Sequence, residues 1–256
     1  MSVRTQNLAN DVDMVDSRWK DLYKIGGICG ILMSVLTIIA IGIYFIWPYK
    51  PGLTSTFDIF TTIQKNKLSG LMSLDFFMVV ITFITIPFFL ALYVSLKKVN
   101  ESYALIALAF GMISCVLGFT MRPIAELFYL SGQYALATTD AARSQYLAAG
   151  EAFSAIFNGT EWILYFLTFG VTLLTSSLLM LRTKIFSRTT AYMGIFLNIG
   201  LLSIFAFIIP NFTTISAIIN LVTTLIGTVW NVLVARTFFH LAFSKPDASA
   251  EINYAM

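Results

Sequence analysis

The sequence predicts an all-α integral membrane protein, a bundle of six transmembrane helices, and three observations carry that prediction. Hydrophobic residues make up 58% of the 256 residues and charged residues only 11%, whereas a soluble domain carries about 25% charged residues. The mean hydropathy is +0.82. The apolar residues also gather in six long runs. Because lipid offers no water to backbone amides and carbonyls, such runs must be helices.

Each run has roughly the 20 apolar residues that a helix needs to cross a membrane at about 1.5 Å per residue. Strands of a membrane barrel would be about 10 residues long and would alternate in polarity, and these runs do neither. The predicted spans are residues 25–47, 71–96 (with Pro87 inside), 102–121, 158–181, 190–209 and 215–243.

Polar tails flank the membrane domain, so the chain divides into residues 1–24, 25–243 and 244–256. The first tail lacks the basic start, short apolar core and cleavage site of a signal peptide. Six spans put both tails on one side, together with 11 lysine and arginine residues, against 5 on the other side. The positive-inside rule then places both termini in the cytoplasm, and we expect a multi-pass protein of the plasma membrane.

The two longer loops, 48–70 and 122–157, are therefore expected outside, each with a short helix. In TTDAARSQYLAAGEAF, Thr139 and Asp140 are capping residues ahead of a helical stretch. In FDIFTTIQK, Phe57, Phe60 and Ile63 share one helical face. We expect both helices to lie on the outer surface of the bundle or of the membrane.

Ionisable residues inside the predicted spans are the candidate functional residues, because charge in hydrocarbon is costly. Counted from the cytoplasmic ends at about 1.5 Å per residue, Asp75 lies about 33 Å away, Arg122 about 29 Å and Glu161 about 31 Å. The hydrocarbon layer is about 30 Å thick. All three side chains are therefore predicted near the outer boundary, at one level.

The segment TMRPIAELF places Glu126 about one turn after Arg122. If the helix continues through Pro123, the two side chains share a face and can pair. Alternatively, Pro123 begins a new helix outside the membrane. The charged residues either line an outward-opening polar pocket or are rim residues that pair and snorkel at the interface. The candidate ligand-binding residues are Asp75, Arg122, Glu126, Asn158 and Glu161.

Other chemistry-bearing patterns are sparse. Cys29 and Cys115 lie inside apolar runs and His240 stands alone, so we predict no disulfide, no metal site and no cofactor. Basic residues are dispersed among the gaps between spans, which argues against a nucleic-acid partner. The pair Gly26 and Gly30 has the spacing of close helix packing. Mid-membrane Asn198 is expected to form interhelical hydrogen bonds.

Several of these features together resemble a prokaryotic family of six-helix membrane proteins catalogued as domain of unknown function 4386. They are Asp75 early in the second span, Leu92-Tyr93 near its end, the turn Lys98-Val99-Asn100, and Arg122 with Glu126. The resemblance covers roughly residues 20–243. The chain departs from the family in spacing its charge pair by four rather than three, and in having Arg188-Thr189 where a proline is common. The resemblance implies a fold but no activity.

Three functions stay open. The first is binding of a small polar or lipid-headgroup ligand in the outward-facing polar site, because an arginine with carboxylates suits a zwitterion. The second is a structural or regulatory role beside another membrane protein. The third is an intramembrane enzyme in which Glu161 or Glu126 acts as a base. The sequence contains no nucleophile motif or nucleotide-binding motif that would favour an enzyme.

Overall fold

The computed structural model describes residues 17–46, 54–157, 159–207 and 213–244. Every regular element within these ranges is a helix, which confirms the all-α class. The elements are η1 (Ser17–Trp19), α2 (Lys20–Ile46), α3 (Thr56–Lys65), α4 (Lys67–Ser73), α5 (Phe76–Leu96), α6 (Glu101–Thr120), α7 (Ile124–Leu136), α8 (Asp140–Ile156), α9 (Thr160–Met180), α10 (Arg188–Phe196), η2 (Leu197–Phe207) and α11 (Thr213–Phe243).

In the part of the chain that the structure describes, five helical stretches are long and apolar enough to cross a membrane, and they fall on α2, on α5, on α6 with α7, on α8 with α9, and on α11. The span predicted at 190–209 is not among them, because it forms the short helix α10 followed by the 3-10 segment η2. Asn198 lies where the chain changes from the α-helix α10 to the 3-10 segment η2. Its side-chain amide donates to Gly194 O at 3.2 Å, the acceptor that its backbone N–H would use in an α-helix.

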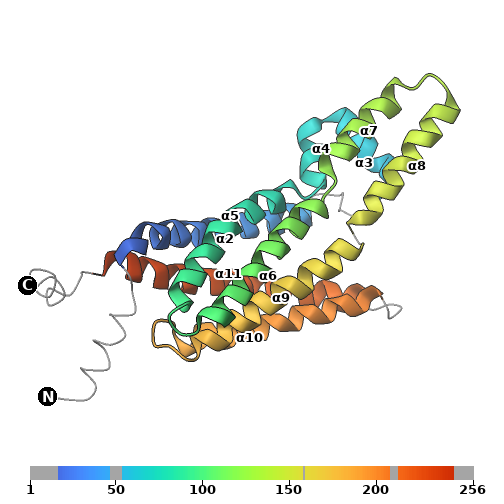
Figure 1. The fold of residues 1–256 in the computed structure, drawn as a ribbon. Coiled ribbons are helices and arrows are strands. Elements are labelled where there is room, and N and C mark those ends of the chain that lie inside the picture. Colours follow the sequence, from blue (N-terminus) through green and yellow to red (C-terminus); the bar gives the residue numbers. More distant parts are fainter. Residues whose placement is uncertain (1–16, 47–53, 158, 208–212, 245–256) are drawn as a thin grey trace, which may run out of the picture.

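The long helices run side by side (Figure 1), and their packing contacts close a ring. Helix α2 packs between α5 and α11, and α6 packs between α5 and α9. The 3-10 segment η2 lies between α9 and α11 and completes the circle. The segment that falls short of a regular spanning helix therefore still occupies the sixth place in the bundle.

One end of the bundle gathers the start of α2 with the ends of α5 and α11. The Lys20 ammonium donates to Ser244 O at 3.0 Å, and the Lys97 ammonium stands 4.6 Å from the centre of the Trp19 ring. The start of α2 and the end of α11 thus lie at the same end of the bundle.

The bundle interior is aromatic and closely packed. The ring of Phe88 lies 6.0 Å from that of Trp230 and 5.6 Å from that of Phe238, and all three side chains are fully buried or nearly so. Helix α2 approaches closely through its glycines: a Cβ on Gly26 would overlap Ala91 of α5, and one on Gly30 would lie 3.1 Å from a carbonyl of α11. The predicted close packing at these glycines is confirmed.

The short helices α3, α4, α7 and α8 form a separate layer at the opposite end, which we call the cap (Figure 1). The two helices predicted on the outer surface of the bundle or of the membrane, α3 and α8, pack on α7 and on each other. Their apolar faces meet one another rather than the bundle. The core of the cap consists of Ile59, Phe60, Ile63, Leu74, Leu127, Leu130 and Phe157.

The chain passes from bundle to cap through a break at residues 121–123. Pro123 has φ −77° and ψ 60°, and the Ile124 N–H donates to Arg122 O at 2.8 Å. This is an inverse γ-turn, which proline favours because its φ is fixed near this value. Helix α7 then begins at Ile124, so the continuous-helix alternative for TMRPIAELF is wrong and the new-helix alternative holds.

Candidate functional site

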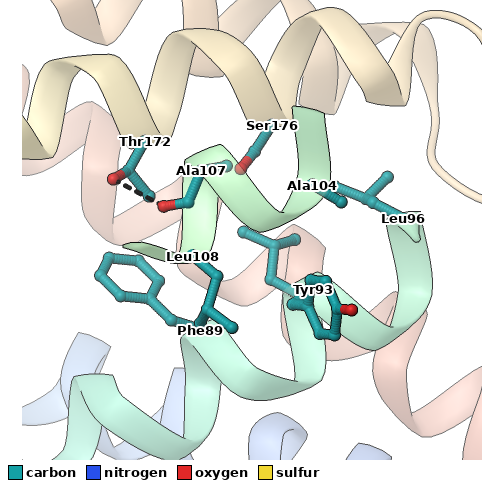
Figure 2. A pocket seen from close by; sticks show the side chains of 9 residues that line it. Phe89, Tyr93, Leu96, Ala104, Ala107, Leu108, Thr172 and Ser176 are labelled. Atoms are coloured by element: carbon teal, nitrogen blue, oxygen red, sulfur yellow. Dashed lines mark hydrogen bonds between the residues drawn. The ribbon is translucent and has the colours of Figure 1, made fainter. Parts of the chain in front are cut away.

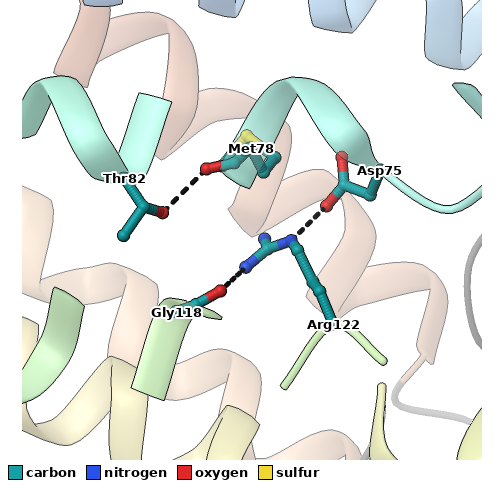
Figure 3. A network of polar contacts seen from close by, with 5 residues as sticks. All are labelled: Asp75, Met78, Thr82, Gly118 and Arg122. Carbon is teal, nitrogen blue, oxygen red and sulfur yellow. Dashed lines mark hydrogen bonds and ion pairs between the residues drawn. The ribbon is translucent and has the colours of Figure 1, made fainter. Parts of the chain in front are cut away.

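The predicted charged residues Asp75 and Arg122 meet where the cap joins the bundle. Arg122 Nε donates to Asp75 Oδ2 at 3.0 Å, and Arg122 Nη1 donates to Gly118 O at 2.6 Å (Figure 3). The Arg122 side chain is 7% exposed and the Asp75 side chain 32% exposed. This is a largely desolvated ion pair, with charge-assisted hydrogen bonds that are stronger than neutral ones.

The local backbone on both sides aims these two side chains at each other. Asp75 stands between α4 and α5 with φ 63° and ψ 36°, the left-handed conformation that aspartate tolerates better than most residues. It is the one non-glycine residue with positive φ in the described ranges. Arg122 follows the end of α6, and its guanidinium folds back over the last turn to reach Gly118.

Gly118 makes room for this arrangement. A Cβ built on it would lie 3.2 Å from Thr82 and 3.4 Å from Tyr165, so α5 and α9 both approach α6 closely here. The Thr82 hydroxyl donates to Met78 O at 2.7 Å (Figure 3). Tyr165 therefore lies beside Gly118, whose carbonyl accepts from Arg122.

Tyr165 was missed by the sequence reasoning, although a signal existed. It follows Glu161 by four residues and so lies on the same face of α9, one turn deeper. Its ring stacks on Phe169 at 5.7 Å and 15°. An amphipathic tyrosine next to a predicted boundary charge is typical of a membrane interface.

The other predicted site residues do not join the pair through hydrogen bonds. Glu126 is exposed on α7 and pairs with no cation in the part of the chain that the structure describes. The break at Pro123 interrupts the helix between the two residues, so Arg122 and Glu126 do not share the helical face that a pair requires. Glu161 is half-buried in the first turn of α9, where the helix dipole favours a carboxylate. Asn158 lies outside the described residues.

Arg122 has hydrogen-bonding capacity beyond its two protein partners. A guanidinium carries five N–H donors, and Asp75 and Gly118 use one each. Its Nη2 bonds no described residue. Among the described residues the one fully buried, unpaired side-chain polar atom is Ser177 Oγ, so Nη2 is not completely enclosed by protein.

Two hollows lie elsewhere. A cavity of about 10 Å³ between α5, α6 and α9 is lined by Tyr93, Ala104 and Ser176, beside the Thr172 hydroxyl that donates to Ala107 O at 3.0 Å (Figure 2). It has the size of one water molecule. A groove of about 390 Å³ opens on the cap between α3 and α7.

The described ranges contain no group of three or more histidine, cysteine, aspartate or glutamate residues that could hold a metal ion. Cys29 and Cys115 are free thiols, both buried in the bundle.

A family model described as "Domain of unknown function (DUF4386)" matches residues 25–236. The chain belongs to the DUF4386 family. The match covers the spans from α2 to the greater part of α11, and with them the cap and the Asp75–Arg122 pair, so this junction lies within the family's own domain. The predicted family membership is confirmed. Comparisons with curated proteins and with solved structures gave no match.

Proposed function

We propose that this DUF4386 protein crosses the plasma membrane six times, with both termini in the cytoplasm, and binds a zwitterionic headgroup at the junction of bundle and cap. The ligand is a small zwitterion or the headgroup of a phospholipid. The proposed binding residues are Asp75, Arg122, Glu126, Asn158 and Glu161. The observation that carries the binding proposal is Arg122, a nearly buried guanidinium with N–H donors that no described residue accepts.

The topology rests on the ring of helices and on the charges at its ends. Segment α10–η2 fills the sixth place between α9 and α11. Nine α-helical residues at about 1.5 Å and eleven 3-10 residues at about 2.0 Å amount to about 35 Å. That length exceeds a hydrocarbon layer of about 30 Å. The end that carries Lys20 and Lys97 is the basic end, which faces the cytoplasm.

The ligand class follows from the chemistry of the pair. A phosphate or carboxylate accepts two parallel hydrogen bonds from a guanidinium, and Nη2 with the second N–H of Nη1 offers such a fork. Asp75 keeps one carboxylate oxygen beyond its bond to Nε, and Glu126 stands exposed above the break. Both suit the ammonium group of a zwitterion. A ligand that carries only negative charge would be repelled by these two carboxylates.

A second candidate function is favoured by the outer face of α7. Tyr129 is 66% exposed and Leu136 is 76% exposed, seven residues apart on one helical face. Gly132 between them has open space around it. Exposed apolar side chains in this row are typical of a contact surface, so a role as the partner of another membrane protein remains the alternative proposal.

The binding proposal is tested by native mass spectrometry from mild detergent containing equal amounts of phosphatidylethanolamine and phosphatidylglycerol. We expect the protein to retain phosphatidylethanolamine, and Arg122→Lys to lose it, because an ammonium lacks the fork. Glu126→Ala and Glu161→Ala should retain less, while Glu151→Ala, an exposed carboxylate of α8, should behave as wild type.

Competition with soluble phosphoethanolamine distinguishes a small free zwitterion from the headgroup of a phospholipid as the ligand. Displacement of the lipid by millimolar phosphoethanolamine indicates that the headgroup alone is recognised. Equal retention of both lipids, or retention unchanged in Arg122→Lys, would contradict the proposal.

A further inference from the structure

The groove on the cap is separate from the Asp75–Arg122 junction. It is a groove of about 390 Å³ between α3 and the end of α7, a volume within the range of small-molecule sites. The lining residues are Phe57, Phe60, Thr61, Gln64, Lys65, Tyr134 and Ala135.

Aromatic rings form the wall of this groove. Tyr134 lies 6.4 Å from Phe57 in an edge-to-face arrangement and 5.7 Å from Phe60. Phe60 is completely buried in the core of the cap, whereas Phe57 is 51% exposed. Covering a half-exposed phenylalanine outside the bundle with an apolar group lowers the free energy. The wall therefore favours an aromatic or short alkyl group.

The rim of the groove has one cation. Lys65 is exposed at the end of α3 and forms no ion pair within the described part of the chain. The Gln64 amide nitrogen donates to Ser131 O and to Ser131 Oγ, each at 2.9 Å. The Thr61 hydroxyl donates to Phe57 O at 2.8 Å. Lys65 and the Tyr134 hydroxyl are thus the side chains of the described lining with donors free for a ligand, and of the two only Lys65 carries positive charge.

The groove is held in shape before any ligand arrives. Ser55 caps α3 by accepting from the Asp58 N–H at 3.2 Å, and Thr56 bonds Ser154 of α8 at 3.1 Å. Ser131 of α7 donates to Phe60 O at 3.2 Å. The bonds of Thr56 and Ser131 join α3 to α8 and to α7, which lowers the entropic cost of ordering the site on binding.

We propose that the cap groove binds a small amphipathic carboxylate, with its ring or short chain on Phe57 and Tyr134 and its carboxylate on Lys65. A single cation at the rim of an aromatic wall complements one negative charge joined to one apolar group. This inference is independent of the headgroup site, since it uses none of the residues of that site.

Fluorine NMR with a ring-fluorinated phenylpropionate tests it on the full chain in phosphatidylcholine nanodiscs, with empty nanodiscs subtracted. We expect saturable binding. Lys65→Met should raise the Kd about fivefold, the factor typical of a partly exposed ion pair, and Phe57→Ala should raise it similarly. Lys67→Met is the matched control, because Lys67 is also exposed but does not line the groove, and it should leave the Kd unchanged.

The neutral analogue phenylpropanol should bind the wild type about as weakly as phenylpropionate binds Lys65→Met. Absence of saturable binding up to about 10 mM, far above the Kd expected of a ligand of this size, would overturn the proposal. Equal Kd values for Lys65→Met and Lys67→Met would overturn it as well, as would equal affinity for the acid and the alcohol.

Discussion

The Asp75–Arg122 pair should contribute measurably to stability, and the change Asp75→Asn isolates its charge. Asparagine matches aspartate in size and tolerates the left-handed backbone at this position, where φ is 63°. The substitution leaves a guanidinium that is 7% exposed without its counter-ion. Breaking a fully buried pair costs about 3–5 kcal/mol. Because Asp75 is 32% exposed and solvent screens part of the interaction, we expect about 2 kcal/mol.

The partner change Arg122→Met removes the bonds to Asp75 and Gly118, and we expect a similar loss, because a hydrogen bond to a charged group contributes about 1.5–3 kcal/mol. The double variant should lose less than the sum, with a coupling energy of about 2 kcal/mol. For a chain of this length, a loss of about 2 kcal/mol lowers the unfolding midpoint of each single variant by about 4–8 °C.

The chain supplies its own reporter for this measurement. Cys29 and Cys115 are free and buried in the bundle, so a thiol-reactive dye labels them only when the helices separate. Thermal unfolding in mild detergent, followed by dye fluorescence, gives the midpoints for the wild type, both single variants and the double variant. A coupling energy below about 0.5 kcal/mol, the value of an exposed surface pair, would refute the reasoning from burial.

Three further predictions follow from the packing and the topology. Gly26→Ala should destabilise the bundle by about 1–3 kcal/mol in the same dye assay, because its Cβ overlaps α5, whereas Gly42→Ala, with open space around it, should not. Phe60→Ala should cost about 3–5 kcal/mol in the cap, and hydrogen exchange should show faster exchange in α3 and α7 while α2 stays protected; faster exchange throughout the bundle would contradict a separate cap core. In a chain without native cysteines, Lys98→Cys should react with a membrane-impermeant thiol reagent only in inverted vesicles and Arg143→Cys only in intact cells, and the reverse pattern would refute the proposed orientation.

Local sequence patterns predicted the helices well where one physical rule dominated. Hydrocarbon requires an apolar run of about 20 residues, and such runs define α2, α5, α6, α9 and α11. Position counting also predicted that Asp75 and Arg122 share a level, which their 3.0 Å contact bears out. The span predicted at 190–209 is instead α10 followed by η2. A hydropathy pattern cannot tell an α-helix from a 3-10 helix.

The amino-acid sequence by itself determined that the long helices are apolar enough to cross a membrane, the helical class, and the membership of the DUF4386 family. These properties depend on composition and on rise per residue, which are local. Only the tertiary structure decided which partner each charge takes. Glu126 follows Arg122 by four residues, yet Arg122 pairs with Asp75, 47 residues away. The reason is that the γ-turn at Pro123 ends the shared helical face, while the left-handed backbone at Asp75 and the small Gly118 bring α5 and α6 together at that depth.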